Sequence, residues 1–223
     1  MGHRLKNLFL NKRANSDTDN LFDDEDLFIQ CEDEVSYFNS SILTSSEEKS
    51  LYEMTNKKAI RLLYKATRDG FTKSAFSSKC DGKANTITIV KNNLNYVFGG
   101  YASRARHSKD EWIEDGNAFI FSLRRNGTST NEKYKVKDPQ KAYFGFASSD
   151  FFLFFSYSSW LFGFGNDIAV KANSNTETGS WTYFGASYQL PEGYTHKSES
   201  ARNYLAGNYD KWLTTEIEVF QLE

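Results

Sequence analysis

The stretch that decides the fold spans residues 70–101 and reads GFTKSAFSSKCDGKANTITIVKNNLNYVFGGY. Thr72 can cap a short helix that ends near Cys80, and the Asp-Gly pair that follows predicts a turn. Beyond the turn, apolar residues alternate over residues 86–91 and resume over residues 96–101, which is typical of strands. The stretch therefore predicts a helix end that leads into the first strands of a sheet.

The rest of the chain also favours strands over helices. Further apolar runs that read as strands occupy residues 117–124, 151–157, 167–171 and 213–222, and residues 181–190 contain another that is interrupted at Gly185. Asn126-Gly127 predicts a hairpin, while Ser45 and Glu48 form a capping-box pattern that predicts a helix over residues 47–67. We therefore expect an α+β protein, mostly β, built as a two-sheet antiparallel β-sandwich flanked by a few helices.

Charge divides the 223-residue chain into two parts. Residues 1–49 carry 11 acidic and 5 basic side chains, whereas residues 50–223 carry 18 acidic and 22 basic ones. We expect a flexible acidic N-terminal arm over residues 1–44 and a folded domain over residues 45–223. The opposite charges predict that residues 16–34 fold back onto the basic body; a disordered leader without specific function is the alternative.

Several classes of protein are excluded by the composition. Two cysteines and three scattered histidines give neither a disulfide framework nor a metal site, and no cofactor motif is present. The body is too weakly basic, and too poor in motifs, for specific nucleic-acid binding. The most apolar stretch, residues 151–160, is about half the length that crosses a bilayer, so we expect no transmembrane segment. The lack of a disulfide framework indicates a reduced compartment, and we therefore expect a cytoplasmic location.

One cysteine and one pair of carboxylates could carry chemistry. Cys80 lies near Lys79 and Lys83, which could lower its pKa and make it a redox thiol, although a helix C-terminus opposes this and cysteines are often buried. Glu216 and Glu218 share one face of the last predicted strand. They could act as acid and base, but a solvated strand face, or ion pairs with Lys133, Lys135 and Lys137, is the commoner arrangement.

Two segments are candidate partner contacts. The loop after residue 101 carries Arg104, Arg106, His107 and Lys109. It could contact an acidic partner, receive the acidic arm, or simply be solvated. Phe151 and Phe152 begin an aromatic run that could be core or an exposed partner surface.

A series of short motifs follow one another along the chain in a characteristic order. They read LLY (62–64), GF (70–71), CDG (80–82), FGGY (98–101), NAFIFSL (117–123), FGFGNDI (162–168), YFG (183–185), YLAG (204–207) and TEIEVF (215–220). In this order and spacing they resemble the TLDc domain of eukaryotic oxidation-resistance proteins, over about residues 47–223.

The resemblance implies a β-sandwich with flanking helices and no agreed catalytic residues or cofactor. It also implies a non-enzymatic interaction domain that protects against oxidative stress and binds the vacuolar proton-pumping ATPase, whose assembly it regulates; this would allow peripheral attachment to organelle membranes. A peroxide-consuming or redox-sensing protein that uses Cys80 is the alternative. In the family motifs, Gly99, Gly100, Gly163 and Gly165 allow positive φ or close backbone approach, and Asp167 can accept hydrogen bonds from a turn.

Overall fold

Two antiparallel sheets form the body of the protein. The computed structural model describes residues 36–107, 111–145 and 160–223, all within one compact unit, residues 34–223. The six-stranded sheet has the order β1 (Ala59–Lys65), β11 (Thr214–Leu222), β2 (Thr86–Asn92), β3 (Val97–Ala102), β5 (Phe119–Arg125) and β6 (Thr128–Lys135). The five-stranded sheet has the order β10 (Trp181–Thr182), β9 (Ile168–Lys171), β8 (Trp160–Phe164), β7 (Tyr143–Gly145) and β4 (Glu111–Ile113). This arrangement confirms the predicted, mostly β sandwich.

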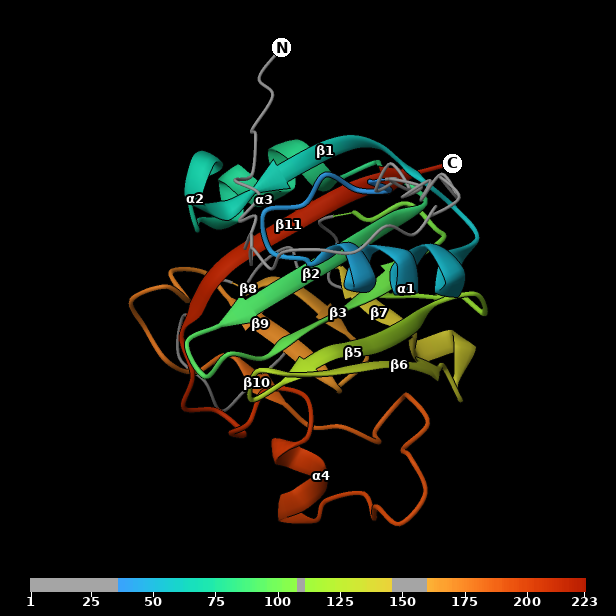
Figure 1. Ribbon diagram of the computed structural model, residues 1–223, viewed down its shortest axis with the longest axis vertical. Helices are drawn as coiled ribbons and strands as arrows, with labels where there is room; N and C mark the ends of the chain where they lie inside the picture. Colours follow the sequence, from blue (N-terminus) through green and yellow to red (C-terminus); the bar gives the residue numbers. More distant parts are fainter. Residues whose placement is uncertain (1–35, 108–110, 146–159) are drawn as a thin grey trace, which may run out of the picture. The chain divides into compact units, whose positions relative to one another are not determined.

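Short helices surround the sheets within the described residues (Figure 1). They are α1 (Ser45–Thr55), α2 (Ala66–Asp69), α3 (Lys73–Cys80), the 3₁₀ turn η1 (Pro139–Lys141) and α4 (Glu199–Asn203). No helix of the described part is long and apolar enough to cross a membrane.

The central strands of the six-stranded sheet are buried on both faces. One face packs against the five-stranded sheet, where Phe98 and Ile217 meet Phe162 in a single apolar cluster. The other face lies under α1 and residues 36–44, where Phe38 joins Phe220 in a second cluster. Because both faces are covered, every residue of the central strand β3 is buried.

The elements with strong local signals lie where the sequence predicts them. Thr72 caps α3, since its side chain accepts a hydrogen bond from the Ala75 N–H. Asn126 and Gly127 have φ values of 47° and 82° and join β5 to β6, as a type I′ hairpin turn requires. The predicted strand over residues 151–157 lies outside the described residues.

The predicted helix over residues 47–67 is correct only as far as Thr55 and wrong beyond it. The helix α1 ends at Thr55, because Asn56 takes the left-handed conformation with φ of 52° and its N–H donates to the Tyr52 carbonyl. The chain then forms β1, which pairs with β11. The capping box also begins one residue earlier than expected, at Thr44 with Glu47 as its acidic member.

Residues 36–44, which we call the strap, belong to the folded domain. The sequence analysis had placed them in the N-terminal arm predicted over residues 1–44. Phe38 and Ile42 are 4% and 5% exposed and pack on the outer face of the six-stranded sheet. The Tyr37 carbonyl accepts a hydrogen bond from the Ala59 N–H, which extends the strap along β1. The apolar strap residues are buried because they cover Phe220 and its neighbours, which would otherwise face water.

Candidate functional site

The glycines of the FGGY motif allow close packing inside β3. A Cβ atom on Gly100 would lie 2.7 to 2.8 Å from the ring of Phe164, which belongs to the other sheet. A Cβ atom on Gly99 would lie 1.9 Å from the Thr88 carbonyl oxygen. Gly163 lies within β8 and pairs with Ala169 of β9. The glycines at these motif positions therefore contribute to the packing of the β-sandwich.

Asp167 connects two loops inside the protein. Its carboxylate is fully buried and accepts hydrogen bonds from the N–H groups of Gly185 and Ser187 at 2.7 and 2.6 Å. Burial raises the pKa of Asp167 to about 7, and the backbone donors oppose this rise. Gly165 has a φ of 55°, and a Cβ there would lie 2.5 Å from the Ser187 Cβ. The turn after β8 is thereby held against residues 185–188. The strand predicted within residues 181–190 ends at Thr182, before the predicted interruption at Gly185.

Cys80 is a buried residue of the core. The side chain is 1% exposed, and burial raises the pKa of its thiol to about 12, although the nearby Arg106 acts in the opposite direction. A thiol with this pKa is protonated at neutral pH, and the thiolate is the reactive form. The surroundings of Cys80 therefore do not favour redox or nucleophilic chemistry.

We expect Cys80 to react with a thiol reagent only slowly in the folded protein. The Cys31→Ser variant leaves Cys80 as the single thiol, so its alkylation by iodoacetamide is read directly by mass spectrometry at neutral pH. Alkylation should be at least about 100-fold faster in denaturant, where the thiol regains its ordinary pKa and access. Equal rates in the folded and unfolded protein would contradict the burial of this group.

The carboxylates of Glu216 and Glu218 are buried at 8% and 1% exposure, so the expectation of a solvated strand face is wrong. Glu216 accepts hydrogen bonds from the backbone N–H and the hydroxyl of Thr67, whereas Glu218 accepts them from strap hydroxyls. Lys65 is their ion-pair partner, with its Nζ 3.9 Å from Glu216 and 3.4 Å from Glu218. These contacts hold α2 and the strap against β11.

The hairpin lysines expected as partners of this pair lie elsewhere. The Nζ of Lys133 donates to the Met54 carbonyl at 2.6 Å, and that of Lys137 donates to the Gly185 carbonyl at 2.6 Å.

The candidate contact loop after β3 separates into a buried and an exposed part. Arg106 is 3% exposed, so its guanidinium is not presented to a partner. Its guanidinium carbon lies 5.5 to 5.7 Å from the ring centroids of Phe76, Phe162 and Phe164. Arg104 is exposed and His107 is half-buried, so both lie at the surface. Lys109, Phe151 and Phe152 lie outside the described residues.

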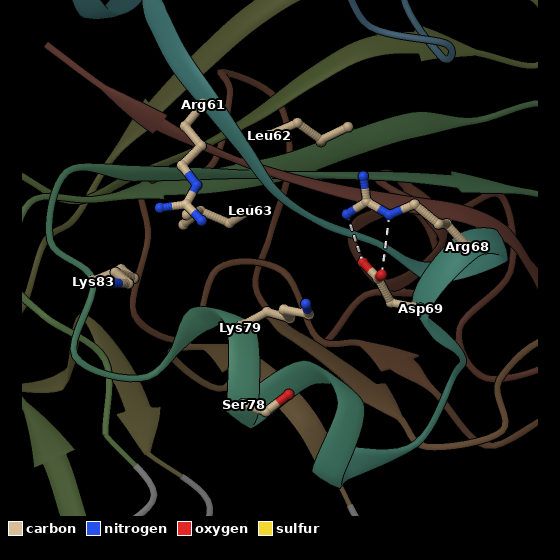
Figure 2. A pocket seen from close by; sticks show the side chains of 8 residues that line it. All are labelled: Arg61, Leu62, Leu63, Arg68, Asp69, Ser78, Lys79 and Lys83. Atoms are coloured by element: carbon tan, nitrogen blue, oxygen red, sulfur yellow. Dashed lines mark hydrogen bonds and ion pairs between the residues drawn. The ribbon is translucent and has the colours of Figure 1, made fainter.

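A basic hollow that the sequence analysis did not anticipate lies between β1 and α3 (Figure 2). Its volume is about 500 Å³, and it opens to the surface. Its lining consists of Arg61, Leu62, Leu63, Arg68, Asp69, Ser78, Lys79 and Lys83. Figure 2 shows Arg61 reaching into the hollow from β1, with Lys79 on α3 and Lys83 beyond it.

An ion pair between Arg68 and Asp69 lies at one end of the hollow. Arg68 makes a two-pronged contact with Asp69, with Nε–Oδ1 and Nη2–Oδ2 distances of 3.0 and 2.8 Å. This contact lowers the pKa of Asp69, so the carboxylate stays ionised and neutralises Arg68. Arg61, Lys79 and Lys83 have no ion-pair partner in the part of the chain that the structure describes.

A signal for this surface exists in the sequence. Residues 57–68 contain five basic side chains and no acidic one. The assignment of this segment to a helix concealed its role, because a strand places the same residues along a sheet edge instead of around a helix.

Within the described ranges, no group of three or more His, Cys, Asp or Glu side chains could hold a metal ion.

The comparisons with known proteins identify the class. The chain matches the model of the TLDc domain over residues 36–223, and it therefore belongs to the TLDc domain family. The match begins where the strap begins. A segment of 63 residues is 27% identical to the MTOR-associated protein MEAK7 of Danio rerio. This alignment covers 28% of the chain and only 14% of that relative, so the relative as a whole is a much longer protein than the region compared.

Proposed function

We propose that this chain is a non-enzymatic TLDc-type interaction domain that binds the vacuolar proton-pumping ATPase and regulates its assembly during oxidative stress. The observation that carries the proposal is the TLDc match, which extends over the whole described domain. The burial and raised pKa of Cys80 weigh against a peroxide-consuming thiol. The proposal places the protein in the cytoplasm, attached to organelle membranes through the pump.

The contact surface in this proposal includes the loop after β3. The side chain of Arg104 is exposed there, and the Arg104 backbone N–H donates to the carboxylate of the buried Asp115 at 3.2 Å. Asp115 also accepts from the hydroxyl and the N–H of Ser103, both at 2.6 Å. The backbone of Ser103 and Arg104 is thus held in place, so this part of the loop loses little conformational entropy on binding.

Affinity purification tests this function. Immobilised full-length protein is incubated with organelle membranes that have been solubilised in mild detergent, and the bound proteins are identified by mass spectrometry. We expect pump subunits to be recovered. Arg104→Glu should reduce the recovery about 10-fold by placing a negative charge in the contact, whereas Lys135→Glu, on exposed β6, should leave it unchanged. Failure to recover any subunit while the pump is intact and abundant would contradict the proposal.

A further inference from the structure

The basic hollow between β1 and α3 concentrates positive charge, because four basic residues and a single carboxylate, Asp69, line it. Elsewhere in the described structure, the part-buried side chains of Arg124 and Lys171 pair with the carboxylates of Glu47 and Glu177. In the hollow, Arg61, Lys79 and Lys83 come from a strand, a helix and a loop and line one concavity. Like charges that line one concavity repel one another, and an anionic ligand would relieve this repulsion.

We propose that this hollow binds a compact anion that carries two or more phosphate groups. A phosphate ester carries a charge of about −1.5 to −2 at neutral pH, so two such groups balance the three cations whereas one does not. The volume of about 500 Å³ is suited to a small ligand. The Arg68–Asp69 pair at one end directs the ligand toward the other three basic residues, because the Asp69 carboxylate repels anions.

The edge of β1 favours this ligand over an extended acidic peptide. A peptide that adds to a sheet edge needs a row of free backbone groups. The Ala59 N–H already donates to the Tyr37 carbonyl, and the Lys65 N–H donates to the Asp69 carboxylate at 3.0 Å. The pairing of β1 with β11 also shifts register twice, which disrupts a regular edge. The side chains in the hollow, rather than the backbone, are therefore what this surface offers to a ligand.

Such phosphates could come from a soluble inositol phosphate or from a lipid headgroup. Ile60, next to Arg61, is the one large apolar side chain of the described residues that is classed as exposed, at 50%. Lys57 and Lys58 precede it in the sequence. An exposed apolar residue beside basic ones is suited to the surface of an anionic membrane. Binding of a soluble ligand would not require Ile60, and binding to lipid would.

Calorimetry and vesicle sedimentation test the site with the full-length protein. The probes are inositol trisphosphate, inorganic phosphate, a glutamate-rich peptide, and phosphatidylcholine vesicles with and without phosphatidylinositol bisphosphate. We expect inositol trisphosphate to bind more tightly than inorganic phosphate or the peptide, with an affinity that falls as salt rises. The combined variant Arg61→Gln, Lys79→Gln, Lys83→Gln should weaken this binding about 100-fold.

Matched variants distinguish a site from general electrostatic attraction. Lys49→Gln, Lys135→Gln and Lys197→Gln together remove the same charge from exposed positions outside the hollow, and they should change the affinity less than about 3-fold. Arg61→Lys, Lys79→Arg, Lys83→Arg should retain binding. Ile60→Ser should weaken binding to the lipid vesicles alone if the headgroup is the natural source, and should change neither probe if the source is soluble.

Three results would overturn the proposal. The first is that the wild type does not bind inositol trisphosphate. The second is an equal loss of affinity in the hollow variant and the control variant. The third is that the glutamate-rich peptide binds as tightly as the trisphosphate, which would make an acidic segment the occupant. The test uses no pump, so its outcome is independent of the proposed function.

Discussion

Gly99→Ala is expected to destabilise the domain severely, because β3 has no space for a side chain at this position. Gly99 pairs with Ile89 of β2 on one side and with Phe121 of β5 on the other. The added Cβ would lie 1.9 Å from the Thr88 carbonyl oxygen and 2.9 Å from the Phe121 ring. The carbonyl oxygen belongs to the central backbone of the sheet and cannot rotate away as a flexible side chain could. We expect a loss of about 4 kcal/mol or more in the free energy of unfolding.

Thermal and chemical denaturation measure this effect. The unfolding midpoint should fall by about 10 °C or more for a domain of this size. Gly116→Ala is the matched control, since its Cβ would come no closer than 3.9 Å to any neighbour, at Pro139, and its φ lies outside the left-handed region. It should change the stability by less than about 1 kcal/mol. A Gly99→Ala protein as stable as the wild type would contradict the close strand packing in β3.

Removal of residues 1–44 is expected to destabilise the domain far more than removal of residues 1–35. The longer deletion removes the strap. Phe38 and Ile42 then no longer cover the outer core, and burial of such side chains stabilises by about 2 kcal/mol each. The deletion also removes the hydrogen-bond donors of two buried carboxylates, Glu48 and Glu218.

The loss of donors adds to the loss of packing. Glu48 accepts hydrogen bonds from the N–H groups of Phe38 and Ser40 at 3.1 and 2.8 Å, and Glu218 accepts one from the Ser40 hydroxyl at 2.5 Å. Buried carboxylates that lose such partners cost several kcal/mol unless water reaches them.

Urea denaturation of the two truncated proteins measures the contribution of the strap directly. We expect the protein that starts at residue 36 to unfold cooperatively, near the wild-type midpoint. The protein that starts at residue 45 should be less stable by about 4 kcal/mol or more, or fail to fold. Equal stability of the two truncated proteins would contradict the placement of the strap in the domain. It would instead support the predicted boundary between the arm and the domain at residue 44.

The sequence predicted the elements whose signals are local. The Thr72 cap, the Asn126-Gly127 turn and the alternation in β2 each depend on a few neighbouring residues, and the structure confirms them. The segment that became β1 was misassigned because its apolar spacing also fits a helix. Its strand conformation depends on pairing with β11, which lies more than 150 residues later in the chain. No local pattern reports such a partner.

The roles of the candidate site residues were harder to predict, because burial is a property of the whole fold. Glu218 and Arg106 look like surface charges in the sequence but are 1% and 3% exposed in the structure. Glu218 is buried because the strap crosses its face of β11, and Arg106 is buried against aromatic rings from α3 and β8. The hollow likewise requires three separate elements to meet, which a single stretch of sequence does not show.

Binding to the vacuolar proton pump is tested most directly by co-sedimentation with vesicles that carry the purified pump. Pump-free phosphatidylcholine vesicles of the same lipid are the control, so that attraction to lipid is measured separately. We predict that the full-length protein sediments with the pump-containing vesicles alone, and that Arg104→Glu lowers the bound fraction while Lys135→Glu does not. Equal sedimentation with both kinds of vesicle, or with neither, would contradict the proposal that this TLDc domain binds the pump.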